Sequence, residues 1–361
     1  MKFKPKNFIC KNCGGVLRYD VLSHELKCDF CGSIEKIEKS NKPIEEYDFK
    51  EGLAKFSKNR VVDNREITCN KCGATFKLDS YELSSLCPYC KTPIITDLTK
   101  DIQPKSLIPF EITEKEAQER FKKWIGSLWF APNQLKDFVD GNKKLIGYYL
   151  PYWTFDSNTR TKYSGERGDI YFVTVKRVVE INGEDVEIEE EEPRIMWTPV
   201  SGEVYHSFDD VTVGASKTIS HSLLDRLAPW NTKELIPFNE KYLSGFVSEE
   251  YTIDLTEGFR YAKEQMKRVI IGDIKRDIGG DQQQIDYMHT EYSDTTYKDT
   301  LFPIYSAEFK WQGKLYDYLI NGQSGKVVGE RPYSVVKITI AIISTITILV
   351  IIYYIYGRYH H

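Results

Sequence analysis

The chain has 361 residues, a formal net charge of −4 and a pI near 6.0. This length exceeds what one hydrophobic core usually serves, so it predicts two or three domains. The composition is that of a globular protein, and its slightly acidic balance excludes an overall electrostatic attraction to nucleic acid.

Every cysteine of the chain belongs to one of two sets that repeat the same spacing. In each set, two Cys-x2-Cys pairs are separated by 14 residues. The first set is Cys10, Cys13, Cys28 and Cys31, and the second is Cys69, Cys72, Cys87 and Cys90. Four thiolates can hold one tetrahedral zinc ion, and such a closed shell leaves no open position for catalysis. The pattern therefore predicts two structural zinc ions, each in its own zinc ribbon.

Disulfides in a secreted domain are the alternative interpretation of these cysteines. Residues 1–5 read Met-Lys-Phe-Lys-Pro and lack the apolar core of a signal peptide, so we expect reduced thiols. A redox role for one pair is a further alternative, although such motifs do not come in matched doubles. Glycine follows three of the four pairs, at Gly14, Gly32 and Gly73, and Lys91 follows the fourth. We expect tight turns at these positions that point backbone amides at sulfur.

The local charge of the ribbons bears on nucleic-acid binding. Residues 1–40 carry eight Lys/Arg and five Asp/Glu, and residues 60–100 carry six and five. A zinc ion with four thiolates adds a charge of about −2, so both ribbons are close to neutral. Neither has the strongly basic face of a typical DNA-binding module, but a small cluster of lysines remains at Lys2, Lys4, Lys6 and Lys11.

The ribbons are predicted at residues 7–36 and 65–97, with a charged linker at 37–64 that includes one short helix. The body is predicted at residues 104–334. Thr113 and Glu116 form a capping box for a helix that runs to about Leu128. A second short helix is expected after Pro132, with apolar residues at Leu135, Phe138 and Val139.

The next part of the chain predicts strands. Residues 148–156 are aromatic and apolar, and residues 169–181 lead to Asn182-Gly183, which is the strongest short hairpin signal. The return strand, 184–200, carries an acidic run that we interpret as a solvated hairpin tip, with a site for a basic partner as the alternative. Residues 204–213 predict another strand, with Asp209 and Asp210 in or beside a turn.

The remainder of the body alternates helices and strands. Residues 221–227 suggest a short helix, and apolar residues from Leu255 to Ile274 recur every three or four positions, which predicts an amphipathic helix of about 20 residues. Strands are expected at 302–307 and 308–320. The fold class is therefore α+β: two N-terminal four-cysteine zinc ribbons, a mostly antiparallel sheet with a few helices, and a C-terminal transmembrane helix.

The predicted transmembrane helix covers residues 335–356. Its core, Ile338 to Ile355, has 18 residues without a charge, and tyrosines lie at its end as in an interfacial belt. Lys326, Arg331 and Lys337 precede the span and only Arg358 follows it. The positive-inside rule then predicts a single-pass cell-membrane protein with a cytoplasmic N-terminal part and a C-terminal tail anchor. The final His360-His361 pair is interpreted as incidental.

Known catalytic patterns are absent from the sequence. It contains neither a G-x-x-x-x-G-K-[ST] phosphate loop nor a G-x-S-x-G elbow, and the cysteines are assigned to zinc. His24 lies between the cysteine pairs of the first ribbon, where four thiolates suffice without it. We expect no enzymatic activity and no catalytic residues, with an enzyme that uses the central sheet as the weaker alternative.

Several motifs along nearly the whole chain resemble one family. They are the paired four-cysteine ribbons, Ile108-Pro109-Phe110, Phe130-Ala131-Pro132-Asn133, Leu150-Pro151-Tyr152-Trp153-Thr154-Phe155-Asp156, Phe208-Asp209-Asp210-Val211, and residues 321–332 beginning Asn321-Gly322-Gln323. The chain resembles bacterial TFIIB-type zinc-ribbon membrane proteins. Members are often labelled primosomal protein N′, replication factor Y or phage replisome organiser, and other members look like partners of flotillin-like (SPFH) and PspA-type proteins in envelope-stress complexes.

The sequence and this resemblance together predict a membrane-anchored cytoplasmic adaptor that docks partner proteins, with no small-molecule substrate. The resemblance implies that the partners are membrane-associated scaffold proteins of the SPFH or PspA type. A zinc-ribbon factor that binds nucleic acid in replication or transcription, through the first ribbon, is the alternative.

Overall fold

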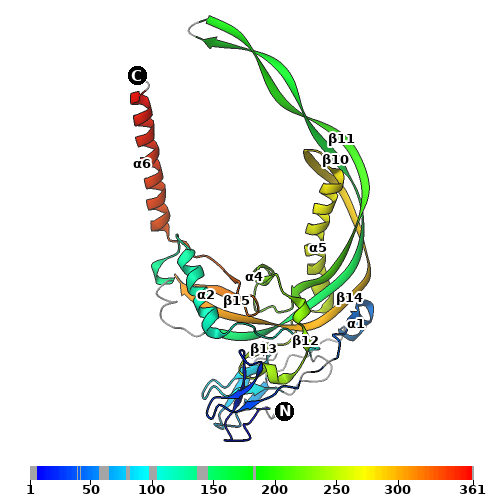
Figure 1. Cartoon of the computed structure of the whole chain (residues 1–361), viewed down its shortest axis with the longest axis vertical. Coiled ribbons are helices and arrows are strands. Elements are labelled where there is room, and N and C mark those ends of the chain that lie inside the picture. The colour runs from blue at the N-terminus through cyan, green and yellow to red at the C-terminus, as the bar shows by residue number, and fades with distance from the viewer. Residues whose placement is uncertain are drawn as a thin grey trace.

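The computed structural model describes residues 6–38, 40, 42–56, 65–78, 82–96, 104–135, 145–181 and 184–359. Within these residues it confirms the expected α+β class. The chain has a mostly antiparallel sheet with helices packed on it, two clusters of four cysteines, and one apolar helix at the C-terminal end. In Figure 1 the ribbons lie below the sheet, and the apolar helix projects on the other side.

Most strands join one sheet, which has 11 strands among the described residues. Its pairings are antiparallel except for those of β10 with β13 and of β14 with β9, which are parallel. The strands are β4 (Tyr47–Asp48), β7 (Glu82–Leu86), β8 (Pro93–Ile95), β9 (Ser106–Leu107), β10 (Ile146–Ile181), β11 (Glu184–Gly214), β12 (Ile236–Pro237), β13 (Val247–Glu249), β14 (Gln282–Trp311), β15 (Lys314–Asn321) and β16 (Val327–Gly329).

The first ribbon forms its own sheet, whereas the second joins the large one. Strands β1 (Leu17–Asp20), β2 (Glu25–Cys28) and β3 (Ile34–Glu35) belong to the first ribbon. In the second ribbon, β5 (Arg65–Thr68) pairs with β6 (Thr75–Leu78), while β7 and β8 extend the large sheet through β13. The second ribbon is therefore covalently and structurally continuous with the body.

Three unusually long strands, β10, β11 and β14, form a curved, three-stranded part of the sheet. Helix α5 (Leu255–Ile278) packs against one face of it (Figure 1). The apolar positions of α5 recur at helical spacing, and Asp254 caps its first turn by accepting from the backbone N–H of Glu257. The helix thereby confirms the sequence prediction. Its buried side chains are Leu255, Phe259, Ala262, Met266, Ile270, Ile274 and Ile278.

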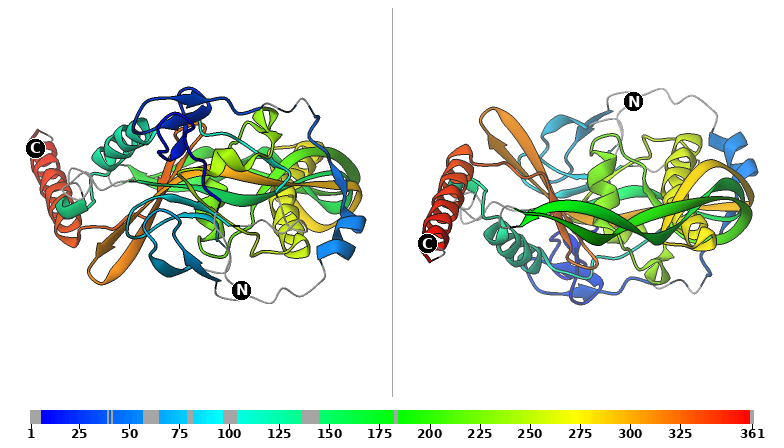
Figure 2. Two further views of the ribbon diagram at one scale, coloured as in Figure 1. Left: turned by 90° about the horizontal axis from the view of Figure 1, so that it is seen from below. Right: turned by 90° about the horizontal axis from the view of Figure 1, so that it is seen from above.

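Beyond Gly168, strands β10 and β11 pair with each other and with no other described strand. Gly168 pairs with Gln282 at the start of β14, and from residue 169 onward β10 pairs only with β11. We call this two-stranded extension, residues 169–181 and 184–197, the arm. It projects far from the body on the same side as α6 (Val335–Tyr359), as Figure 1 shows. Figure 2 shows that α6 and α5 stand near opposite ends of the body.

The remaining helices are short and cover the sheet. Helix α2 has the predicted capping box at Thr113 and Glu116 and ends at Ser127, with Leu128 as its C-cap. Helix α4 confirms the short helix predicted at residues 221–227. The elements are α1 (Phe49–Phe56), α2 (Glu114–Ser127), α4 (His221–Leu227), and the 3₁₀ turns η1 (Thr232–Glu234) and η2 (Glu240–Leu243).

Several local predictions were wrong or fall outside the described residues. The strands expected at 302–307 and 308–320 are instead β14 and β15, which turn at Gln312-Gly313, and both residues have positive φ. Asp209 and Asp210 lie at a bulge within β11 and not at a turn between strands. Residues 133–135 are helical, but Phe138 and Val139, the Asn182-Gly183 turn and His360-His361 lie outside the described residues.

Candidate metal centres

The predicted ligand sets come together as two separate four-sulfur clusters. In the first ribbon, Sγ atoms lie 3.6 Å apart for Cys10 and Cys31 and 3.5 Å apart for Cys13 and Cys28. In the second, the distances are 3.7 Å for the first and last cysteines and 3.8 Å for the middle two. The four sulfurs of each set lie within 4.8 Å of one another.

These distances fit zinc and exclude disulfides. A tetrahedron with bonds of about 2.3 Å from zinc to sulfur has edges of about 3.8 Å, close to the separations in both clusters. A disulfide would bring two sulfurs to about 2.05 Å, and all eight cysteines are free thiols in the structure. The residues present therefore fit a tetrahedral metal ion in each ribbon.

The same backbone turn supports all four Cys-x2-Cys pairs. In the first pair, the Gly14 N–H donates to the Cys10 carbonyl at 2.9 Å, and the Cys10 N–H donates to the Gly15 carbonyl at 2.7 Å. Equivalent pairs of bonds occur after Cys28, Cys69 and Cys87. The residue after the second cysteine has φ near +72° in the three glycine cases and +57° at Lys91. The sequence prediction of tight turns is confirmed, including the turn that must accommodate a side chain.

A hydroxyl group contacts the last cysteine of each ribbon. The Ser33 hydroxyl lies 3.0 Å from Cys31 Sγ, and the Thr92 hydroxyl lies 3.1 Å from Cys90 Sγ. The hydrogen bond with Ser33 lowers the pKa of Cys31 to about 5, and that with Thr92 lowers the pKa of Cys90 to about 6. Both changes favour the thiolate that binds metal. Sequence reasoning missed these two residues, although a hydroxyl two positions after the last cysteine repeats in both ribbons.

His24 does not belong to the first cluster. Its Nδ1 lies 2.7 Å from the Tyr19 hydroxyl and its Nε2 lies 3.8 Å from a Glu111 carboxylate oxygen. The group of potential ligands around Cys10 comprises the four cysteines alone among the described residues. The histidine instead links the ribbon to the chain segment before α2.

The turn between η2 and β13 attaches both ribbons to the body. The Tyr19 N–H donates to the Ser244 carbonyl, and the Ser244 hydroxyl donates back to the Leu17 carbonyl, both at 2.8 Å. On the other side, the Ser84 hydroxyl of the second ribbon donates to the Phe246 carbonyl at 2.9 Å. Each ribbon is thus hydrogen-bonded to the same short stretch of the body.

The ribbons also contact each other directly. Arg18 of the first ribbon donates to the Lys91 carbonyl at 2.6 Å, and the Lys6 backbone forms an antiparallel bridge with Ile95. A cleft of about 470 Å³ lies between them, lined by the Phe30 ring from the first ribbon and by Lys71 from the second. The Lys71 ammonium lies 5.2 Å from the centre of that ring, so it forms a cation–π contact. These contacts fix the orientation of one ribbon relative to the other.

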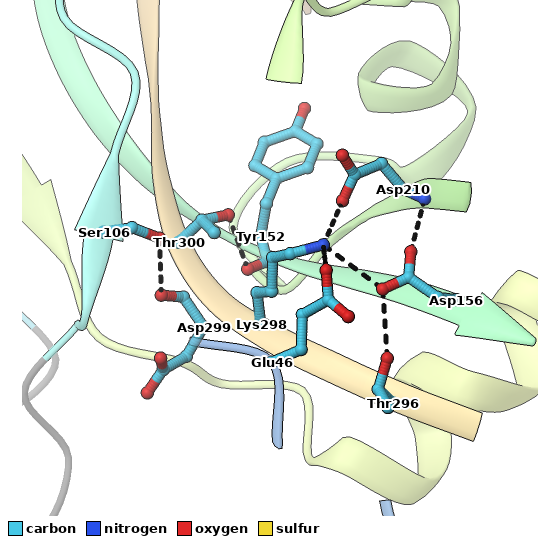
Figure 3. Close-up of polar contacts among 9 residues, drawn as sticks. All are labelled: Glu46, Ser106, Tyr152, Asp156, Asp210, Thr296, Lys298, Asp299 and Thr300. Atoms are coloured by element: carbon cyan, nitrogen blue, oxygen red, sulfur yellow. Dashed lines mark hydrogen bonds and ion pairs between the residues drawn. The ribbon is translucent and has the colours of Figure 1, made fainter. Parts of the chain in front are cut away.

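A third group of potential ligands, Asp156, Asp209 and Asp210, lies at the bulge between β10 and β11. The Lys298 ammonium is 2.6 Å from an Asp210 oxygen, 3.2 Å from Asp156 and 3.0 Å from Glu46 (Figure 3). Burial lowers the pKa of Lys298, but the hydrogen bond to Asp210 and the nearby carboxylates raise it above its ordinary value. The ammonium thus supplies the positive charge that a metal ion would bring, and the cluster is a buried ion-pair network.

A neighbouring carboxyl group forms no ion pair with the described residues. Asp299, next in the chain and on the opposite face of β14 (Figure 3), is 8% exposed, and its Oδ1 has no hydrogen-bond partner among the described residues. Burial raises the pKa of Asp299 to about 7. This group therefore stays largely protonated in the folded protein at mildly acidic pH.

Helix α6 is the described element that could cross a membrane. Its residues Val335–Tyr356 have a mean hydropathy of 2.6 and are not covered by other parts of the chain. At its start, the Lys337 ammonium donates to the Ala131 carbonyl at 2.7 Å, and the Ser334 N–H donates to the Phe130 carbonyl at 2.8 Å. The base of the helix is thereby fixed to the loop that follows α2.

Comparisons with known proteins give one informative relative. No family model matches the chain, and no solved structure matches it. The chain is 27% identical over 339 residues to the uncharacterized protein YdjG of Bacillus subtilis (strain 168). The match covers 91% of this chain and 90% of that relative, so it spans nearly the whole of both proteins.

Proposed function

We propose that this protein is a non-enzymatic, membrane-anchored adaptor whose zinc ribbons dock partner proteins at the cytoplasmic face of the cell membrane. The observation that carries the proposal is an exposed aromatic side chain at the same position of both ribbons. Phe30 precedes Cys31 and Tyr89 precedes Cys90, and these residues are 71% and 69% exposed. Aromatic residues on a rigid support are typical anchors of protein interfaces.

The metal in both ribbons is proposed to be zinc with a structural role. Four-cysteine ligation, sulfur separations near those of a zinc tetrahedron and the repeated backbone turns support this assignment. Metal analysis of the purified chain should find two zinc ions, and X-ray absorption should find four sulfur ligands around each. A Cys72→Ser variant should contain one zinc ion per chain in place of two. A value of one zinc ion or none in the unchanged protein would contradict the assignment.

The anchor is proposed to be α6, with the rest of the chain on the cytoplasmic side. The length and hydropathy of α6 support a single span, and the excess of Lys and Arg before it supports the orientation. Partners of the SPFH or PspA type, acting in an envelope-stress complex, are proposed on the resemblance of the sequence motifs. Such partners are themselves associated with membranes, which agrees with an adaptor held at the same surface.

Affinity purification tests this adaptor function. The full chain is purified from gently solubilised membranes, and the bound proteins and nucleic acid are identified. With a Phe30→Ala/Tyr89→Ala double variant, the amount of protein partner recovered should be at least ten-fold lower than with the unchanged chain. The matched control is Trp129→Ala, because Trp129 is also a large aromatic, 80% exposed, but lies on the body. If the double variant recovered as much partner as the unchanged chain, docking through the ribbons would be contradicted.

Nucleic-acid binding is the second candidate, and the cleft between the ribbons is the observation that favours it. An exposed ring at Phe30 beside the Lys71 ammonium offers one surface for base stacking and one charge for a phosphate. Because the ribbons are close to neutral, we expect weak binding of duplex DNA, with a dissociation constant of about 10⁻⁴ M or higher. Sub-micromolar, sequence-selective binding at about 0.15 M salt would favour this candidate over the adaptor.

A further inference from the structure

The arm has two edges, and their chemistry differs. On β10, the Ile170 N–H donates to the Asp281 carboxylate at 2.7 Å and not to a neighbouring strand, while the Gly168 carbonyl accepts from the Asp281 N–H. Even-numbered residues of β10 therefore direct their backbone groups away from β11 in this region. Beyond Ile170, no described strand pairs with this edge, which continues along Phe172, Thr174, Lys176 and Val178.

The outer edge of β11 is protected against strand addition. The register pairs Gly168 with Trp197, so odd-numbered residues of β11 direct their backbone groups outward. These positions include Pro193, which has no N–H to donate, and the acidic residues Asp185, Glu187, Glu189 and Glu191. Proline and repeated charge are the usual means by which proteins block an edge. The outer edge of β10 has neither proline nor repeated charge at its outward positions from 172 to 178.

No described strand or helix packs on the arm beyond Ile170 to stabilise it. A two-stranded hairpin alone is marginally stable in water, and here Phe172 and Val178 are 63% and 66% exposed. The other face of β10 carries Val173 and Val175, each only partly buried. A third strand in line with β14 would pair the free backbone groups and cover part of this apolar surface.

The net negative charge of the arm indicates which chemistry an added strand would need. Residues 169–197 contain nine acidic and three basic residues. Lys176 pairs with Glu187, and Arg177 pairs with Glu190 and Glu192, but Glu189 and Glu191 have no ion pair with the described residues. This excess of carboxylates opposes contact with anionic lipid and insertion into hydrocarbon. It also opposes pairing with a second, equally acidic arm.

We propose that the free edge of β10, residues 172–178, binds an extended basic segment of a partner protein, which adds to the sheet as a strand in line with β14. Main-chain bonds supply the affinity of this binding mode, and alternate side chains supply its specificity. Apolar residues of the segment pack against Val173 and Val175, and its basic residues lie on the same face of the sheet as Glu189 and Glu191, across β10 from them. This inference deepens the proposed adaptor function and rests on it, because it adds a docking surface separate from the ribbons.

The test uses the full chain in detergent and a fluorescent ten-residue peptide of alternating valine and lysine. Binding is followed by fluorescence anisotropy at about 0.15 M salt, where interactions between distant surface charges are screened. Thr174→Pro removes an outward N–H of β10 that the hairpin does not use, and it should weaken binding at least ten-fold. The matched control Ile195→Pro removes an outward N–H of β11, changes no charge and lies outside the register of residues 172–178, so it should change binding less than three-fold.

A second variant separates charge from strand pairing and does not introduce proline. The double variant Glu189→Lys/Glu191→Lys should weaken binding of the lysine peptide at least ten-fold and allow binding of an alternating valine–glutamate peptide.

Equal weakening by both proline variants, or no binding by the unchanged chain, would overturn the proposal. So would dimers of the unchanged chain that Thr174→Pro dissociates, since the edge would then be occupied by a second copy. Partner recovery through Phe30 and Tyr89 is measured separately, so a failure here is distinct from a failure of the adaptor function.

Discussion

At the scale of single residues, the turns that follow the four Cys-x2-Cys pairs are alike except for one position. Three of the four turns have glycine at the left-handed position, and the fourth has Lys91 at φ +57°. A residue with a side chain costs about 1–2 kcal/mol in that conformation. The hydrogen bond from Arg18 to the Lys91 carbonyl helps to hold this turn in place.

Lys91→Gly should therefore stabilise the second ribbon by about 0.5–1 kcal/mol, because relief of the strain exceeds the entropy lost by glycine. The measurement is the urea concentration at which half of the zinc in that ribbon is released. Gly73→Ala, at the first turn of the same ribbon, is the matched reverse change and should lower this midpoint. A lower midpoint for Lys91→Gly would show that the lysine side chain contributes more than the strain costs.

Asp299 makes a pH-dependent contribution to stability. Burial raises its pKa to about 7, so between about pH 4 and pH 7 the folded state binds more protons than the unfolded state. Its contribution is favourable at low pH and is lost as the pH rises through 7. The difference in unfolding free energy between Asp299→Asn and the unchanged chain should thus grow in favour of the variant from pH 5 to pH 8. A difference that is constant with pH would contradict this assignment.

At the scale of elements, the network around Lys298 stabilises the bulged part of the sheet where β10, β11 and β14 lie side by side. Lys298 comes from β14, Asp156 from β10 and Asp210 from β11, so one ammonium joins all three long strands where a bulge interrupts their register (Figure 3). Lys298 is only 7% exposed and the two carboxylates are 16% and 20% exposed. Removal of the ammonium would leave two partly buried carboxylates close together without its positive charge, although Asp156 would keep the hydrogen bonds from the Asp210 N–H and the Thr296 hydroxyl.

Lys298→Met should cost about 2–4 kcal/mol of unfolding free energy, near the range for breaking one partner of a buried ion pair. Amide exchange should increase first in β10 and β11 near residues 155–158 and 208–211. Lys314→Met is the matched control, because Lys314 also lies in the sheet and pairs with Glu330 but is 63% exposed. Its effect should be far smaller, and equal effects of the two variants would contradict the network's role.

The elements differ in how far the sequence predicts them. The ligand sets, α5 and α6 follow from patterns that one segment carries alone: cysteine spacing, helical periodicity and an unbroken apolar run. Residues 282–301 of β14 were not predicted because their apolar residues, Ile285, Met288 and Tyr292, do not alternate regularly. A bulge at Asp286 of β14, opposite Ser164 and Gly165 of β10, changes which residues of that strand share a face, and only the pairing with β10 defines it.

The candidate site shows the same limit. The eight cysteines were predicted from spacing, but the contacts of Ser33 and Thr92 with sulfur, and the attachment of both ribbons to Ser244 and Phe246, depend on folding. The Asp209-Asp210 pair was noted in the sequence without its cation, since Lys298 is 88 residues away from Asp210 along the chain. Long-range contacts of this kind leave no local pattern.

At the scale of the whole molecule, the proposed anchor and the proposed docking surfaces lie on different parts of one folded unit. The ribbons are hydrogen-bonded to the body, and α6 is fixed to the loop after α2. The chain lacking residues 335–361 should therefore be soluble and retain both zinc ions, whereas the full chain should resist extraction by alkaline carbonate. Recovery of the full chain in the soluble fraction would refute a membrane span.

The location of the bound partner tests the adaptor account most directly. Cells that express the full chain are compared with cells that express residues 1–334, and the partner identified by affinity purification is measured in membrane and soluble fractions. The account predicts that truncation moves the partner to the soluble fraction while it still co-purifies with the ribbons. A partner that stays at the membrane in both cases, or a truncated chain that binds nucleic acid and no protein, would contradict it.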